Sequence, residues 1–504
     1  MNAKERRKLR KKQRRLAKRL DRNNGSGDNG PVFKTTNVKY EVSEKVSAVR
    51  VGGVAAAHVL AKKVGLARAI DERLRLLKVH APYHESDHVL NIAYVMLAGG
   101  DKLEDLEMLR EDEAYMNVLG ARRIPDPTTA GDFLRRFDAL DIIRLMDLVN
   151  EIRVKLWREQ SKDFRGTAII DADGTMTPTD GEKKRGMAIS HKGIWGYHPL
   201  LVSLANTREP LFIVNRPGNA VSQDDAASWL DRAVELTRHA FEDVLLRGDT
   251  AFSLTQNFDR WTEDKVRFVF GYDACANLVQ IADSLENSAW RPLARKTRPV
   301  KTRRRTKREN TKDDIVREKE FKNFRLKCED IAEFKYKPAR CKSEYRMIVV
   351  RKNLTVEKGE IHLFDDIRYF FYITNDDTMT PEAVVANANE RCNQENLIEQ
   401  LKNGVNALRV PMYDLVSNWA YMVVTSLGWT LKAWMALVQP RDKDRDLLLS
   451  MKFKKFLNRL MFLPCQVVRR ARSVLMRALS YTSGLRLVFE ANDAARRLGR
   501  APAT

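Results

Sequence analysis

The stretch TAIIDADGT, residues 167–175, joins a short apolar run to two carboxylates and a glycine. The run has the length and β-branched content of a buried strand, so we predict a strand over residues 167–173 that ends in acids. Asp171 and Asp173 are two positions apart, which places their side chains on the same side of that strand. We therefore expect a sheet that presents carboxylates at one edge.

The segments that follow extend this sheet. Apolar runs predict strands over residues 198–205 and 211–215, and the turn at 206–210 implies that the two form an antiparallel meander. A helix is expected next, over about 222–241, because apolar residues recur there at helical spacing.

Two further strands are expected after that helix, over residues 243–248 and 266–272. The first of them ends at Asp249. A meander followed by parallel crossovers is the chain order of an RNase H-like fold. In such a fold Asp173 and Asp249 would end neighbouring central strands.

Positive charge is concentrated in two segments. The chain has 504 residues, with 90 Lys and Arg against 67 Asp and Glu, a formal net charge of +23. Residues 1–22 and 291–327 together account for 21 of these excess charges. So basic a chain favours polyanionic partners, and the internal run with Arg303, Arg304 and Arg305 is typical of a loop that contacts a phosphate backbone. The N-terminal run is equally compatible with a solvated tail.

The apolar segments and the cysteines argue against a membrane or secreted protein. The most apolar stretch, residues 415–437, contains Asn418 and Lys432 and is typical of a buried helix rather than a membrane span. No apolar segment of a secretory signal follows the basic N-terminus. The five cysteines are odd in number and include no Cys-x-x-Cys pair, which disfavours a disulfide framework or a zinc knuckle. We expect a cytoplasmic protein without a membrane partner.

Three histidines, His80, His84 and His88, are spaced by four residues. Pro82 lies between the first two, and no carboxylate completes an obvious metal site in this pattern. The sequence therefore favours surface or loop histidines here over metal ligands.

A helix is expected from Pro381 to about Lys402, with the proline in its first turn. Arg391, Glu395 and Lys402 share one face of it, because they are separated by four and seven residues. Such a stripe alone is usual for a solvated, salt-bridged surface. Beside the strand-end aspartates it gains another meaning, because two Asp and one Glu form an oxygen cage suited to Mg²⁺ or Mn²⁺. Two such ions support in-line phosphoryl transfer.

The helix carries a recognisable signature. Arg391, Glu395 and Lys402 match the last three positions of the pattern Tyr-x2-Arg-x3-Glu-x6-Lys, and Ala388 stands at the tyrosine position. The chain thereby resembles the DDE transposases of bacterial insertion sequences, in the cut-and-paste branch that this signature defines.

Other stretches support the same resemblance, which covers roughly residues 45–480. The first and second acidic motifs of the family resemble DGT at 173–175 and LLRGDTAF at 245–252. Further landmarks resemble GYHPL at 196–200, YITN at 372–375 and the stretch 97–112.

The resemblance implies a site. Asp173, Asp249 and Glu395 would be the catalytic residues and would bind two Mg²⁺ or Mn²⁺ ions, and Asp171 remains an alternative to Asp173 as the first ligand. The DNA contacts would come from six residues: Arg391, Lys402, Arg303, Arg304, Arg305 and Trp290. Of these, Trp290 is the candidate to stack on a flipped base, and an ordinary packed tryptophan is the competing interpretation.

The resemblance also implies an activity. The protein would bind terminal inverted repeats, cleave DNA and join the ends to target DNA, as a homodimer on paired ends near the nucleoid of a bacterium. Two alternatives stay open, namely an RNase H-fold nuclease or resolvase without strand transfer, and a non-catalytic DNA-binding relic.

The chain is expected to be an α/β protein, with an RNase H-like catalytic core, a β-rich insertion and flanking helical domains. The predicted segments are a basic tail and linker over 1–30, a helical N-terminal DNA-binding domain over 31–160, the first part of the core over 161–272, a basic β-rich insertion over 273–375, the last part of the core over 376–404 and a helical C-terminal region over 405–504, with possible dimer contacts.

Overall fold

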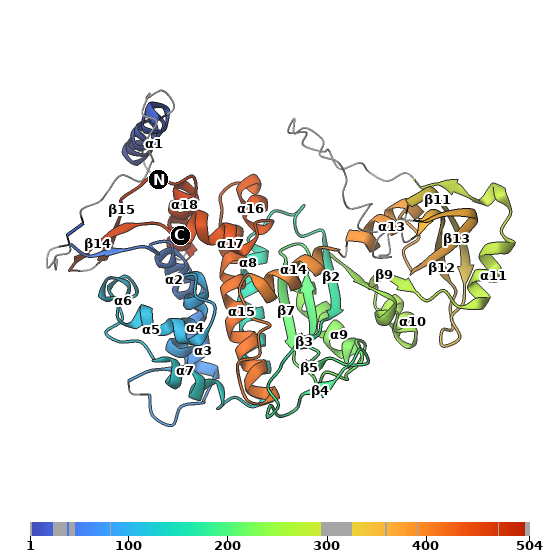
Figure 1. Ribbon diagram of the computed structural model, residues 1–504, viewed down its shortest axis with the longest axis horizontal. Coiled ribbons are helices and arrows are strands. Elements are labelled where there is room, and N and C mark those ends of the chain that lie inside the picture. Colours follow the sequence, from blue (N-terminus) through green and yellow to red (C-terminus); the bar gives the residue numbers. More distant parts are fainter. Residues whose placement is uncertain are drawn as a thin grey trace, which may run out of the picture.

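The computed structural model describes residues 3–23, 38–39, 46–80, 82–293, 325–357, 360–390, 392–471 and 473–498. Along its long axis the molecule shows a helical body, a central sheet and a β-rich extension (Figure 1). Among the helices of these residues, none is long and apolar enough to cross a membrane.

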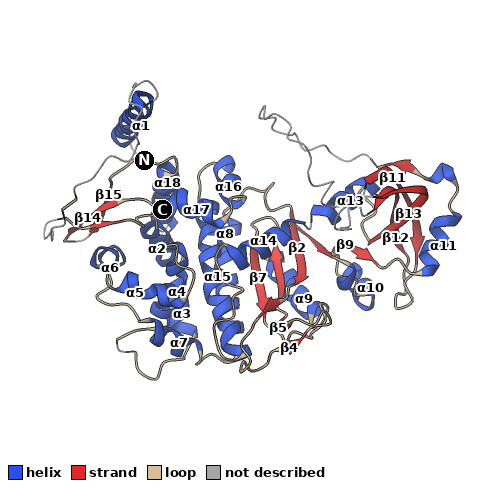
Figure 2. Ribbon diagram, in the orientation of Figure 1, coloured by secondary structure: helices blue, strands red, loops and turns tan. Residues whose placement is uncertain are grey.

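A nine-stranded mixed sheet connects the centre of the molecule to the extension (Figure 2). Its spatial order is β10-β11-β12-β13-β9-β8-β2-β6-β7. The strands are β2 (Thr167–Gly174), β6 (Leu200–Leu204), β7 (Glu209–Val214), β8 (Asp243–Gly248), β9 (Arg267–Tyr272), β10 (Arg291–Pro292), β11 (Arg325–Tyr336), β12 (Tyr345–Glu357) and β13 (Glu360–Thr374).

The central strands have the arrangement that the sequence predicted. β2, β6 and β7 form an antiparallel meander, whereas β8 pairs parallel with β2 and β9 pairs parallel with β8. Every residue of β6 and β7 is buried, including the polar Ser203 and Glu209. Helix α9 (Ala226–Arg238) lies between β7 and β8 in the chain and packs on β2, β6, β7 and β8. A smaller sheet beside them comprises β3 (Thr177–Pro178), β4 (Ala188–Ile189) and β5 (Trp195–Tyr197).

The expected insertion is rich in β-structure, but its strands continue the central sheet. β11, β12 and β13 form a second antiparallel meander, and β13 pairs with β9 from Phe371 opposite Tyr272 to Thr374 opposite Val269. The same segment contains helix α11 (Ala276–Ser284). Residues 294–324, which hold most of the internal basic run, lie outside the described residues.

The helical body is built around α15 (Leu415–Leu437), which is buried along nearly its whole length. It packs against α2, α4, α8 and β7, and it coincides with the segment expected to be a buried helix. The helices that precede the sheet are α1 (Ala3–Asn23), α2 (Val54–Lys63), α3 (Leu66–Arg73), α4 (Glu85–Leu97), α5 (Leu106–Arg110), α6 (Glu113–Leu119), α7 (Pro127–Leu134) and α8 (Ala139–Arg158).

The C-terminal region is not wholly helical, which corrects the sequence prediction. Between α16 (Asp442–Leu449), α17 (Phe453–Phe456) and α18 (Leu485–Leu498) it contains a hairpin of β14 (Cys465–Arg470) and β15 (Ser473–Ala478). Burial alternates along β14 between Cys465 and Val468, as in a strand with one face against the core.

The two ends of the chain share one structural unit. β14 pairs with β1 (Ala48–Val49), and α18 packs against α2. The N-terminal and C-terminal segments therefore form a common body rather than two separate domains.

Candidate active site

Asp173 and Asp249 lie at the same edge of the central sheet. In the parallel ladder of β2 and β8, Asp171 is opposite Arg247. Asp173 and Asp249 each follow that pair by two residues, so both lie where the carboxyl ends of neighbouring strands meet. Strands in a sheet are about 4.8 Å apart, which keeps these two positions close to each other.

The side chain of Asp249 is oriented by a backbone N–H group two residues further along the chain. Asp249 precedes the short 3₁₀ turn Thr250–Phe252, and its Oδ1 accepts a hydrogen bond from the N–H of Ala251 at 3.0 Å. This cap fixes the start of the turn and leaves the carboxylate at the sheet edge, half-buried.

Asp171 is engaged with an arginine inside the sheet. Arg247 donates from Nε and Nη2 to the two carboxylate oxygens of Asp171, at 2.7 and 2.9 Å, and both side chains are at most 2% exposed. Arg247 also donates to the carbonyl of Asn387 at 3.1 Å and lies 3.6 Å from Glu390, near the end of α13 (Pro381–Glu390). This geometry favours Asp173 over Asp171 as the first metal ligand.

Glu395 lies on α14 (Cys392–Asn403), and the residue before it ties that helix to the sheet. Gln394 is buried, donates from Nε2 to the carbonyl of Leu201 at 3.4 Å, and accepts a hydrogen bond from the Ser203 hydroxyl. Leu201 is the residue of β6 opposite Asp173. The first turn of α14 therefore lies beside the strand that carries Asp173, with Glu395 exposed.

Lys402 contacts the same edge from the other end of α14. Its ammonium group donates to the carbonyl of Met176 at 2.8 Å, three residues beyond Asp173. Burial lowers the pKa of Lys402, and the nearby carboxylates of Glu399 and Asp173 oppose that shift. Glu395 and Lys402 both lie on α14, whereas Arg391, the third residue of the predicted face, lies outside the described residues.

His198 is a neighbour of the site that sequence reasoning did not single out. A Cβ atom on Gly174 would lie 2.8 Å from its Cε1 and 3.0 Å from its Nε2, so the ring lies against the residue after Asp173. Its Nδ1–H donates to the carbonyl of Ala220 at 2.9 Å. Burial, and then the charge of Arg216, lower its pKa and favour the neutral ring. The only signal in the sequence was its position in the GYHPL stretch.

The remaining predicted DNA contacts are less fully placed. Arg391, Arg303, Arg304 and Arg305 lie outside the described residues. Trp290 is half-buried, with the guanidinium of Arg351 4.3 Å from its ring centre and the ring of Tyr369 6.1 Å away. It is thus packed on the extension, over strands β12 and β13.

The chemistry of the acidic site follows from its donors. Asp173, Asp249 and Glu395 offer carboxylate oxygens, which suit a hard divalent cation such as Mg²⁺ or Mn²⁺. Lys402 adds a positive charge beside them, suited to a phosphate group.

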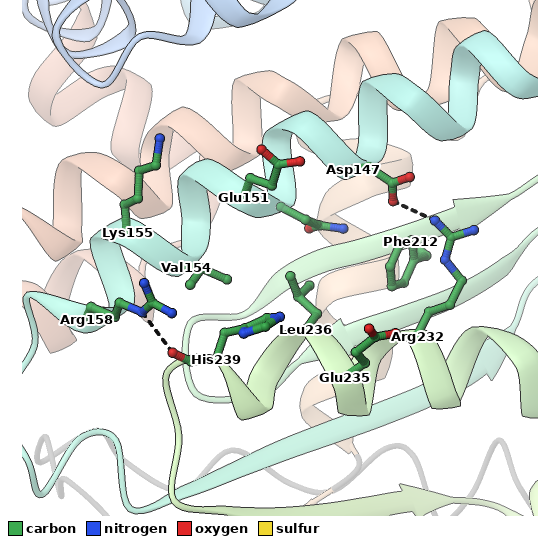
Figure 3. Close-up of a pocket in the computed structure, with 11 residues that line it drawn as sticks. Asp147, Glu151, Val154, Lys155, Arg158, Phe212, Arg232, Glu235, Leu236 and His239 are labelled. Carbon is green, nitrogen blue, oxygen red and sulfur yellow. Dashed lines mark hydrogen bonds and ion pairs between the residues drawn. The ribbon is translucent and has the colours of Figure 1, made fainter. Parts of the chain in front are cut away.

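A separate hollow of about 520 Å³ lies between α8 and α9 (Figure 3). Asp147 of α8 forms an ion pair with Arg232 of α9 at 2.6 Å, and Arg158 donates to the carbonyl of His239 at 2.8 Å. None of the acids at the sheet edge lines this hollow.

Comparisons with known proteins give one family. The family described as "Transposase DDE domain group 1" matches residues 43–499. No curated protein matches the chain. Among solved structures, the piggyBac transposase synaptic complex with hairpin DNA has 10% sequence identity and a TM-score of 0.36, over 82% of this chain and 83% of that chain.

Proposed function

This chain belongs to the transposase DDE domain group 1 family, and we propose that it is the transposase of a bacterial insertion sequence, which moves DNA by cut-and-paste transposition. The observation that supports an active enzyme is the meeting of Asp173 and Asp249 at one sheet edge, with the helix of Glu395 held there by Gln394. Membership of the family makes phosphoryl transfer on DNA the expected chemistry.

We propose an RNase H-like core for the central part of the chain. The order β7-β6-β2-β8-β9, with an antiparallel meander on one side and parallel strands on the other, supports it. In this core Asp173, Asp249 and Glu395 would hold two Mg²⁺ or Mn²⁺ ions. Such ions, when bound, activate the attacking oxygen and stabilise the leaving oxygen of an in-line displacement.

The side chains around the acids position the DNA in this proposal. Lys402 would contact a phosphate at the sheet edge, and Arg391 would also bind phosphate. Arg303, Arg304 and Arg305 would bind the DNA backbone, and Trp290 would stack on a base only after leaving its present contact with Arg351. The substrates would be the terminal inverted repeats and a target site, bound by a homodimer.

An excision assay in cells tests the proposed function. A marker flanked by the gene's native DNA ends is combined with the wild-type protein or with Asp249→Asn. Excision by the wild type alone is the expected result, and both proteins should bind the ends equally. Excision by Asp249→Asn would show that Asp249 is not a catalytic residue.

The same assay separates the two alternatives. Cleaved ends without any rejoined product would indicate a nuclease or resolvase. Bound ends that neither protein cleaves would indicate a DNA-binding relic, an outcome to which the replacement of the signature tyrosine by Ala388 gives some weight.

A further inference from the structure

A cluster of two histidines and one glutamate lies far along the chain from the acids of the sheet edge. His80, His84 and Glu85 bring one ligand atom each to within 4.8 Å of one another. His80 and His84 belong to the segment that joins α3 to α4, and Glu85 is the first residue of α4, in the helical body (Figure 1). The histidine spacing was visible in the sequence, and the structure supplies the carboxylate that the pattern lacked.

Glu85 is the unusual member of this cluster, because its carboxylate is completely buried. Its Oε1 accepts hydrogen bonds from the backbone N–H groups of Leu76 and Leu77, each at 3.1 Å. Among the described residues its Oε2 accepts no hydrogen bond. A buried carboxylate with an unsatisfied oxygen is costly unless a cation lies beside it.

The unsatisfied oxygen points to the histidines. Oε2 of Glu85 lies 3.3 Å from Nδ1 of His80, its one ion-pair partner in the described part of the chain. The rings of His80 and His84 are stacked, with centroids 5.3 Å apart. Both rings are exposed, so they can adjust around a shared ligand, whereas the carboxylate is fixed by its backbone donors.

The third histidine of the pattern does not join them. His88 is 3% exposed and stacks on Phe133, with ring centroids 4.4 Å apart. It is therefore part of the core between α4 and α7.

We propose that His80, His84 and Glu85 bind one Zn²⁺ ion, which fastens the segment between α3 and α4 to the first turn of α4. Two imidazole nitrogens and one carboxylate oxygen are a donor set that zinc accepts and that Mg²⁺ does not prefer. Zinc with ligands at 2.0–2.1 Å has ligand atoms about 3.4 Å apart, which the His80–Glu85 distance already matches. The hydrogen bonds from Leu76 and Leu77 orient the carboxylate as outer-shell partners do in metal sites. A water molecule would complete the tetrahedron.

Zinc titration of the full-length protein tests this site. Metal is first removed with a chelator, and Zn²⁺ is then titrated against a chelating dye in excess Mg²⁺, which occupies the acids of the sheet edge. The compared proteins are the wild type, His80→Ala, His84→Ala and the control His239→Ala, which removes an exposed histidine elsewhere. Thermal unfolding is measured with and without Zn²⁺.

The wild type and His239→Ala should bind one more Zn²⁺ ion than the two other variants and should melt at a higher temperature with it. Loss of one ligand should weaken binding at least about 100-fold, since even outer-shell changes cost 10–100-fold. Equal zinc stoichiometry and affinity in all four proteins would overturn the proposal, as would a wild type that binds no zinc. Neither readout depends on transposition.

Discussion

Asp171 and Arg247 form a bidentate ion pair across two parallel strands, fully buried and two residues before the carboxylates of the sheet edge. The pair fixes the register in which Asp173 and Asp249 come together. Through the carbonyl of Asn387 it also holds the end of the helix that precedes Glu395. The ion pair thus connects β2, β8 and α13 two residues away from Asp173 and Asp249.

Breaking this pair should destabilise the fold. Asp171→Asn would leave the buried Arg247 with only the exposed Glu390, 3.6 Å away, as a counter-charge, so the free energy of unfolding should fall by about 3–5 kcal/mol. Denaturant titration measures the change. Asp147→Asn is the matched control, because it breaks an exposed ion pair with Arg232 and should cost at most about 1 kcal/mol. Equal losses in the two variants would contradict the structural role given to Asp171.

The two glutamates of α14 should differ sharply in their effect on catalysis. Glu395→Gln should lower the rate of metal-dependent DNA cleavage at least about 1,000-fold, because a metal ligand contributes several kcal/mol to transition-state stabilisation. Glu399→Gln, one turn further on, removes the charge of a carboxylate that accepts a hydrogen bond from Asn403, and it should leave cleavage nearly unchanged. DNA binding is measured alongside, and both variants should retain it. A greater loss of cleavage in Glu399→Gln than in Glu395→Gln would indicate that Glu399, not Glu395, is the metal ligand.

The buried Lys432 should make stability depend on pH. Burial lowers its pKa to about 7 from an ordinary 10.5, and its ammonium donates to the carbonyl of Leu449. Between those two pH values the unfolded chain binds more protons than the folded one, so this residue adds stability as pH rises and removes it as pH falls. The advantage of Lys432→Met over wild type should therefore shrink from pH 7 to pH 10, by at most about 1.4 kcal/mol per pH unit. Unfolding curves across this range check it, and a constant difference would speak against the shifted pKa.

The basic insertion should control affinity rather than sequence choice. Replacing Arg303, Arg304 and Arg305 by Ala should reduce the slope of log affinity against log salt by about 3, since each phosphate contact contributes about 0.9. Fluorescence anisotropy at several salt concentrations measures this for terminal and unrelated DNA. A loss confined to the terminal sequence would assign these arginines to base recognition instead.

Local pattern predicted the central strands well. The strand over residues 243–248 begins and ends as expected, because a short apolar run that is followed by Gly-Asp is typical of a strand that ends in a turn. The prediction of a buried helix over residues 415–437 is likewise confirmed by α15. The hairpin at 465–478 was missed, because its short runs are interrupted by arginines and its pairing with β1 is a long-range contact.

The parts of the site that sequence could not reveal depend on register and distance. The pairing of Asp171 with Arg247 requires knowing how two strands 76 residues apart align. The part of Glu85 in the histidine cluster depends on the burial of its carboxylate under the backbone of Leu76 and Leu77, which no spacing rule encodes. In the same way, the continuity of the insertion with the central sheet follows from a single strand pairing, β13 with β9.

The packing of α18 on α2 has a consequence for protein synthesis. A ribosome adds about 5–20 residues per second, so α2 emerges on the order of 20–80 s before the segment that covers it. During that interval the apolar side of α2 and the partner edge of β1 await residues 465–498. In nascent chains that stop short of α18, α2 therefore stays partly exposed. Such chains are candidates for chaperone binding and degradation. Because the N-terminal elements need the C-terminal ones to fold, truncated translation products would not accumulate as folded proteins able to bind DNA.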